Sequence, residues 1–125
     1  LLQVILVGQP ELNNRLNLYD LRQLRQRIMV RYHIGPLDND EIKLYINHRL
    51  EIAGAKSRLE KNGVEFNDEA ISMISRFSNG TPRLINMVCD RALLAGFVSE
   101  TRQIDLNIIK KCVEELDSYF VGQNV

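Results

Sequence analysis

The sequence predicts a mainly α-helical chain, in which one or two strands of an α/β core are followed by a bundle of four helices. Leu1–Val7 is apolar almost throughout, as a buried strand is, whereas the apolar residues after Leu37 recur at helical spacing. The pair Gly35-Pro36 separates the two patterns. We therefore expect one part over residues 1–36 and a second part over residues 37–125.

The first part is expected to combine strands with short helices. The β-branched residues of Leu1–Val7 are typical of a strand buried on both faces of a parallel sheet. Leu21, Leu24 and Ile28 are spaced as one face of a helix, with Asp20 near its N-cap. The expected elements are strands over Leu1–Val7 and Val30–Ile34, and helices over Glu11–Asn17 and Asp20–Ile28.

The second part carries a start signal before each of its helices. The expected N-caps, in chain order, are Asp38 with Glu41 as its capping-box partner, Asn67 or Asp68, Thr81, and Asp105. Gly80 would end the second helix, and Pro82 would open the third, where its missing N–H costs nothing. From Leu37 onward we expect helices alone.

The buried faces of these helices follow from the spacing of their apolar residues. A polar segment, Ala55–Phe66, separates the first two helices and contains the turn signal Asn62-Gly63. The residues expected to face inward are Ile42, Tyr45, Ile46, Leu50 and Ala53, then Ala70, Met73 or Ile74, and Phe77, and finally Ile109, Cys112, Val113, Leu116 and Phe120.

Composition favours one cytosolic domain. The chain has 125 residues, of which 45% are apolar, enough to bury a core. Its 16 basic and 16 acidic residues cancel, so no overall charge points to nucleic acid or an anionic membrane. Cys89 and Cys112 are expected to be buried, reduced thiols, with a disulfide as the minor alternative. No apolar stretch approaches the roughly 18 residues of a membrane span. The chain opens inside a hydrophobic run without an initiator methionine, as a fragment would.

Motifs for self-sufficient catalysis are absent from the sequence. It contains no G-x-x-x-x-G-K-[ST] phosphate loop, no G-x-G-x-x-G and no H-E-x-x-H. It contains no Cys-x-x-Cys pair either, and no metal site is predicted. His33 and His48 lie apart and are expected to be structural or exposed.

Arginines stand out in two places instead. Arg22 and Arg25 fall on one face of the expected second helix, with Arg27 at its end, and a solvated basic face would explain them. Arg83 is placed in the first turn of an apolar helix, where the positive end of the helix dipole disfavours a cation. Either its side chain reaches water, or an anion binds there. Neither pattern by itself identifies a function.

Taken together, four segments resemble the second half of an AAA+ ATPase of the general secretion pathway protein A (ExeA) family: LLQVILVGQPEL, LRQLRQRIMVRYHIGPL, YINHRLEIAG and SNGTPRLINMVCDRALL. The resemblance covers about Leu1–Leu116, and its motifs are specific in combination and weak one at a time. It implies that residues 1–36 are the C-terminal end of an AAA+ α/β core and that residues 37–125 are its four-helix lid.

The resemblance also implies roles for individual residues. Gln9 would be the polar residue of sensor 1, facing the γ-phosphate and the attacking water. Arg25 or Arg27 would be the arginine finger, which enters the ATP site of the neighbouring subunit in a homo-oligomer. The sequence does not choose between them.

The segment Gly80-Thr81-Pro82-Arg83 matches the sensor 2 motif at the start of a lid helix. On this resemblance Gly80, Pro82 and Arg83 would belong to a nucleotide site, with Arg83 contacting the phosphates. A triphosphate would neutralise a cation that its own helix disfavours, and a guanidinium matches phosphate geometry.

The sequence departs from the family because Walker A and Walker B would both lie upstream. We therefore expect this chain alone neither to hydrolyse ATP nor to bind ATP and Mg²⁺ tightly. In the parent protein, ATP hydrolysis would drive assembly of a secretion or export system, with components of that apparatus at the bacterial inner membrane as partners.

Two alternatives remain open. One is the lid of a DNA-associated ATPase, of the transposition-helper or replication-initiator kind. Nucleic acid is disfavoured, since the helical part has no basic recognition helix and the chain has no tryptophan. The other is a helical interaction domain without any link to nucleotide, in which Arg83 is an ordinary surface residue.

Overall fold

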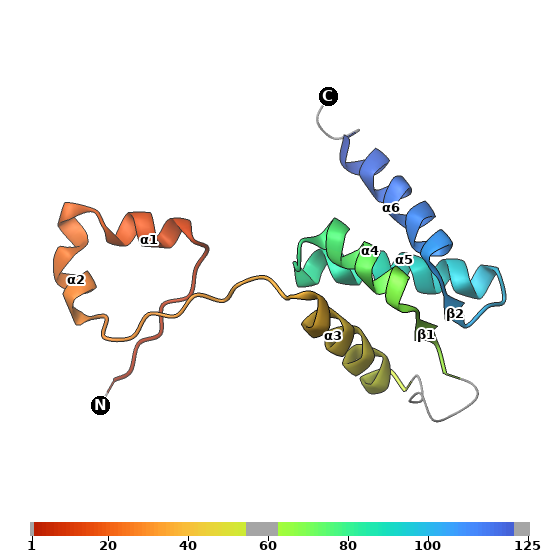
Figure 1. Ribbon diagram of the computed structural model, residues 1–125. Helices are drawn as coiled ribbons and strands as arrows, with labels where there is room; N and C mark the ends of the chain where they lie inside the picture. Colours follow the sequence, from red (N-terminus) through yellow and green to blue (C-terminus); the bar gives the residue numbers. More distant parts are fainter. Residues whose placement is uncertain (1, 55–62, 122–125) are drawn as a thin grey trace. The chain divides into compact units, whose positions relative to one another are not determined.

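The computed structural model describes residues 2–54 and 63–121 and is mainly helical within them (Figure 1). The chain separates into two compact units, Leu1–Ile34 and Gly35–Val125. The elements in chain order are α1 (Glu11–Leu16), the 3₁₀ turn η1 (Tyr19–Leu21), α2 (Arg22–Arg27), α3 (Asn39–Ile52), β1 (Glu65–Phe66), α4 (Asp68–Ser78), α5 (Pro82–Val98), β2 (Gln103–Ile104) and α6 (Leu106–Val121).

The unit Leu1–Ile34 contains the two short helices but neither of the strands predicted from the sequence. Residues 2–7 and 28–34 have no regular secondary structure, so the strand predictions over Leu1–Val7 and Val30–Ile34 were wrong. The apolar side chains of residues 2–7 and 29–34 are exposed, for example Val7 and Met29 at 90% and 94%. A strand needs a neighbour to satisfy its backbone groups, and the described part of this unit supplies no ladder.

The second helix of this unit is also shorter than predicted. Asp20 lies inside the 3₁₀ turn and makes no capping bond, because α2 begins at Arg22. The predicted apolar stripe is only partly covered: Leu21 and Ile28 are half-buried, and Leu24 is 43% exposed. Leu16 of α1 is the buried side chain of this unit among the described residues.

Three of the four expected N-caps in the unit Gly35–Val125 are confirmed. Asp38 accepts from the Glu41 N–H at 2.8 Å, and the Glu41 carboxylate accepts from the Asp38 N–H at 3.0 Å, which completes the capping box of α3. The caps of α4 and α6 are Asn67, which accepts from Ala70 N–H at 2.8 Å, and Asp105, which accepts from Ile108 N–H at 2.9 Å. Thr81 occupies the cap position of α5 without a side-chain capping bond.

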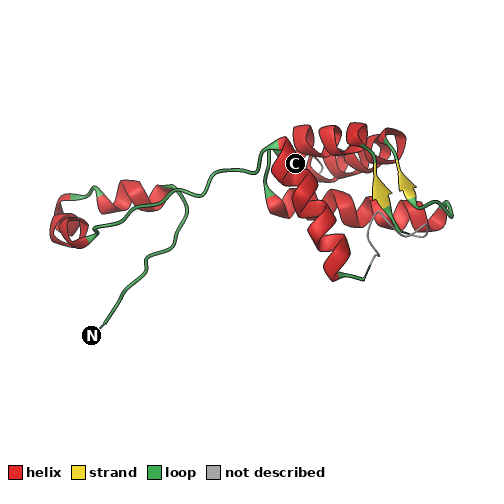
Figure 2. Ribbon diagram, turned by 60° about the horizontal axis from the view of Figure 1, so that its bottom comes forward, coloured by secondary structure: helices red, strands yellow, loops and turns green. Residues whose placement is uncertain are grey.

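The expectation of helices alone after Leu37 was wrong, because β1 and β2 form a two-stranded parallel sheet. Glu65 pairs with Gln103 and Phe66 with Ile104 (Figure 2, yellow). The Glu65 N–H donates to the Arg102 carbonyl at 2.9 Å, and the Asn67 N–H donates to the Ile104 carbonyl at 3.1 Å. This strand pairing holds the segment before α4 next to the segment before α6.

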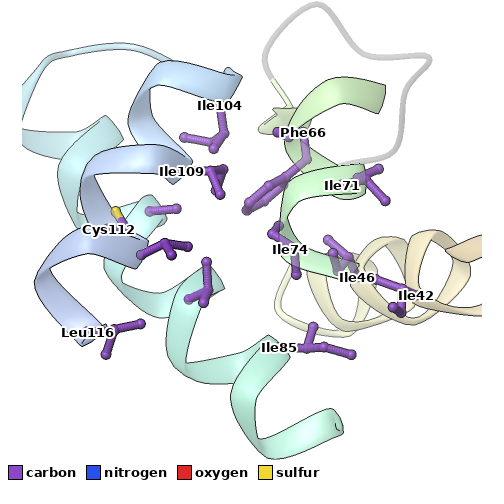
Figure 3. Close-up of a cluster of buried hydrophobic side chains, with 14 residues drawn as sticks. Ile42, Ile46, Phe66, Ile71, Ile74, Ile85, Ile104, Ile109, Cys112 and Leu116 are labelled. Atoms are coloured by element: carbon purple, nitrogen blue, oxygen red, sulfur yellow. The ribbon is translucent and has the colours of Figure 1, made fainter. Parts of the chain in front are cut away.

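The core of this unit is formed by apolar side chains of α3, α4, α5 and α6, among which isoleucine is the commonest residue (Figure 3). The predicted inward positions are largely confirmed, and Ile74, rather than the half-buried Met73, is the fully buried choice. Ala53 is exposed instead, because it follows the last turn of α3. The side chain of Phe120 and the turn expected at Asn62 lie outside the described residues. The buried apolar residues are Ile42, Ile46, Phe66, Ala70, Ile71, Ile74, Ile85, Val88, Ala92, Ile104, Ile109, Cys112, Val113 and Leu116.

The two cysteines are free thiols, as predicted, and no disulfide joins them. Cys112 is buried and Cys89 half-buried. Burial, reinforced by the Asp90 carboxylate, raises the pKa of Cys89 from 9.0 to about 12. The pKa of Cys112 is also raised, first by burial and then by Glu115. Both thiols therefore stay protonated near neutral pH and are poor nucleophiles.

None of the helices in residues 2–54 and 63–121 has the length and apolar character needed to cross a membrane. The longest of them, α5 (Pro82–Val98), has 17 residues and carries Arg83, Asp90 and Arg91 along its length.

Candidate functional site

The turn between α4 and α5 and the start of α5 carry the residues that match the sensor 2 motif. Asn79 and Gly80 adopt left-handed backbone conformations, with φ of 46° and 73°. Ser78 is completely buried, and its hydroxyl accepts from the Gly80 N–H at 3.2 Å. The Thr81 N–H donates to the Ser78 carbonyl at 2.9 Å. These bonds give the turn one defined conformation, from which α5 starts.

The turn is also attached to the chain that leads into α3. The Leu37 N–H donates to the Gly80 carbonyl at 2.9 Å. A Cβ placed on Gly80 would overlap the Leu37 carbonyl oxygen, and would lie 2.7 Å from the Leu37 nitrogen and 2.9 Å from Cβ of Pro36. Gly80 is therefore required by two features, its positive φ and the close approach of another backbone segment. A ligand is not needed to explain this glycine.

Arg83 is the second residue of α5, and its side chain is exposed. Pro82 precedes it at the first helical position, as predicted. The first turn of α5 holds no acidic residue, and Thr81 leaves the helix without a side-chain cap. The guanidinium and the positive end of the helix dipole therefore lie together, with no compensating charge from the described residues of that turn. Such an arrangement is suited to an anion.

The arginines of the other unit differ in how firmly they are held. Arg22 donates to the Tyr19 hydroxyl at 2.9 Å and lies 4.5 Å from the centre of its ring, a cation–π contact. Arg25 donates to Oδ1 of Asn17 at 3.1 Å. Within the part of the chain that the structure describes, Arg27 is exposed and makes no hydrogen bond or ion pair with its side chain.

Gln9 lies just before α1 and is exposed. Its carbonyl accepts from the Leu12 N–H at 2.9 Å, so its backbone starts the first turn of that helix. Gln9, Arg25 and Arg27 belong to the unit Leu1–Ile34, whereas Gly80, Pro82 and Arg83 belong to Gly35–Val125. The six predicted residues are therefore divided between the two units, three in each.

An open groove beside α4 is a feature that sequence reasoning did not find. It has side chains of both charges, and one of them, Asp68, forms an ion pair with Lys43 of α3. No group of three or more His, Cys, Asp or Glu residues in the described ranges is arranged to hold a metal ion. The groove lining is Asp68, Glu69, Ser72, Met73, Arg76, Leu106 and Lys110.

Comparison with known proteins relates the chain to a secretion protein. The chain is homologous to part of the "General secretion pathway protein A" of Aeromonas hydrophila, with 44% identity over 104 residues. The match covers 83% of this chain and 18% of that protein. This chain thus corresponds to a small segment of its relative. No family model matches the chain, and no solved structure matches it.

Proposed function

We propose that this chain supplies the sensor and lid part of an AAA+ ATPase that couples ATP hydrolysis to the assembly of a bacterial secretion or export system. The observation that carries the proposal is the 44% identity, over 104 residues, to a general secretion pathway protein. The AAA+ assignment rests on the order of the motifs in the sequence, above all Gly80-Thr81-Pro82-Arg83. ATP and Mg²⁺ would be held mainly by parts of the protein outside this chain.

The surroundings of Arg83 support a role in contacting phosphates. Its guanidinium is exposed beside an uncapped helix start, so a phosphate would find the side-chain charge and the helix dipole together. The turn before it is held by the buried Ser78 hydroxyl and by Leu37. A contact of this kind to the transferred phosphoryl group would stabilise charge in the transition state.

In the other unit, Arg27 fits the arginine finger better than Arg25. Arg25 already donates to Asn17, whereas the side chain of Arg27 has no partner among the described residues. An arginine that enters the ATP site of a neighbouring subunit has to be free to leave its own surface. The partners of this chain would thus be neighbouring copies of the same protein, and components of the secretion apparatus at the cytoplasmic face of the inner membrane.

The proposal is tested by ATP hydrolysis in the full-length protein that contains this chain, which should also contain a phosphate loop. We expect Arg83→Ala to lower turnover on the order of 10²-fold, the usual effect of removing one charge-stabilising group. Its free energy of unfolding should change by no more than about 0.5 kcal/mol, because Arg83 is exposed and makes no described contact. The matched control is Arg49→Ala, which removes another exposed helical arginine of the same unit. Equal turnover in the two variants would remove Arg83 from the mechanism.

A further inference from the structure

We propose that α3 and the residues leading into it position Arg83 through two polar tethers, one to the turn before α5 and one to α5 itself, so that Tyr45, Asn86 and Gly80 act as positioning residues. The proposal rests on the phosphate role of Arg83 proposed above. One tether is the bond from the Leu37 N–H to the Gly80 carbonyl, 2.9 Å long. The other is the bond from the Tyr45 hydroxyl to Oδ1 of Asn86, 3.1 Å long.

The two tethers lie on either side of Arg83 along the chain. Gly80 is three residues before it, and Asn86 is three residues after it, one helical turn further along α5. Their partners, Leu37 and Tyr45, lie before α3 and in its second turn. The first turn of α5 is thereby held at both of its ends by the same neighbouring segment.

Besides these two bonds, both helices contribute apolar side chains to one shared core, and such packing is less directional. Ile42 and Ile46 of α3 share the core with Ile85 of α5 (Figure 3). Apolar packing resists separation of the helices but permits small rotations and shifts along their axes, whereas a hydrogen bond fixes direction and register. The two tethers therefore fix the rotation of α5 relative to α3, and with it the side of the unit on which Arg83 lies.

As a consequence, the position of Leu37, just before α3, is fixed relative to the start of α5, which carries Arg83. Leu37 is half-buried against the core and bonded to Gly80, so it moves together with the turn.

The test uses the 125-residue chain and Tyr45→Phe, which removes one hydroxyl and keeps the half-buried ring. Asn86→Ala removes the other partner of the same bond. Tyr32→Phe is the matched control, because Tyr32 is exposed and makes no hydrogen bond in the described residues. Two quantities are measured by NMR: the exchange rate of the Leu37 amide, and the affinity for inorganic tripolyphosphate, followed on the Arg83 side-chain resonance.

We expect Tyr45→Phe and Asn86→Ala each to accelerate Leu37 exchange and to weaken tripolyphosphate binding, both by about two- to tenfold, the effect of one lost hydrogen bond. The double variant should lose no more than either single variant, since both remove the same bond. Tyr32→Phe should behave as the wild type. A melting temperature alone would not separate positioning from stability, but weaker phosphate binding in a folded chain does.

Two outcomes overturn different statements. If both variants leave Leu37 exchange and tripolyphosphate affinity unchanged, α3 does not position Arg83, although Arg83 still binds phosphate. Because this chain alone is expected to bind phosphates weakly, tripolyphosphate is added in large excess. If it still does not shift the Arg83 resonance of the wild type, the phosphate role fails and the proposed function loses its support from this residue. The exchange rate of the Leu37 amide in the variants then still shows whether loss of the Tyr45–Asn86 bond weakens the Leu37–Gly80 bond.

Discussion

Replacing Gly80 with alanine should destabilise the unit Gly35–Val125 much more than the same change at Gly54. The two glycines share a left-handed backbone, with φ of 73° at Gly80 and 77° at Gly54. They differ in their surroundings: among the described residues, a Cβ at Gly54 would meet nothing within 4 Å, whereas one at Gly80 would meet the backbone of Leu37. The pair of variants therefore separates the cost of backbone conformation from the cost of the collision.

The magnitudes follow from these two terms. Placing alanine in the left-handed region costs about 1–2 kcal/mol, and the lower entropy of the unfolded chain returns about 0.4–1 kcal/mol. Gly54→Ala should therefore cost about 1 kcal/mol. At Gly80 the atoms to be displaced belong to the backbone, and overpacking of this kind adds about 1–3 kcal/mol. We expect Gly80→Ala to cost about 2–4 kcal/mol in total.

Urea denaturation followed by far-UV circular dichroism measures both free energies of unfolding. Hydrogen exchange of the Leu37 amide reports the same change locally, since the collision should separate that N–H from the Gly80 carbonyl. If the two variants lose equal stability and Leu37 remains protected, the segment before α3 does not pack against this turn. The structural reason given for Gly80 would then be wrong.

The remaining predictions concern a thiol and the arginines of the first unit. The pKa of the Cys89 thiol is about 12 in the folded state, against 9.0 when exposed, so the folded state keeps its proton more tightly than the unfolded state does. The free energy of unfolding is therefore unaffected by this thiol below about pH 9 and decreases as the pH rises towards 12. Between pH 8 and pH 10, the free energy of unfolding should fall by about 1 kcal/mol more in the wild type than in Cys89→Ala, since one pKa unit corresponds to about 1.4 kcal/mol. An equal fall in the two proteins would contradict the raised pKa. In the full-length protein, a phosphate-loop variant and an Arg25→Ala, Arg27→Ala double variant should each be inactive, and mixing them should restore part of the ATPase activity. A mixture that is co-assembled and inactive at every ratio would show that neither arginine acts on a neighbouring subunit.

The helices of the second unit could be predicted because their start signals are local. A capping residue, its partner and the first apolar positions all lie within about four residues of one another. The bonds made by Asp38, Asn67 and Asp105 confirm three such signals. Thr81 is the exception, since its side chain makes no capping bond although its position is as predicted.

The strands could not be predicted in the same way, because a strand depends on a partner strand, whose distance along the sequence is not fixed. Leu1–Val7 has the composition of a buried strand, but residues 2–7 pair with nothing in the described part of the chain. Conversely, β1 and β2 have two residues each, too few for a pattern, and pair across a long separation. The composition of a segment indicates its tendency to form a strand, but a strand forms only where the fold places a partner strand beside it.

The segment Gly80-Thr81-Pro82-Arg83 suggested a nucleotide site, but its residues do not carry equal weight as support for a ligand. Gly80 is explained by its backbone conformation and by Leu37, and Pro82 by the geometry of a helix start. Thr81 supplies the extended backbone at the cap position. Arg83 is different: in the described residues its side chain makes no contact that the fold requires, and the dipole of its own helix disfavours it. A residue that the fold does not explain is the one whose replacement can test function without disturbing structure. For this reason the choice between a nucleotide-linked lid and a plain helical interaction domain rests on Arg83, and substitutions at Gly80 or Pro82 could not decide it.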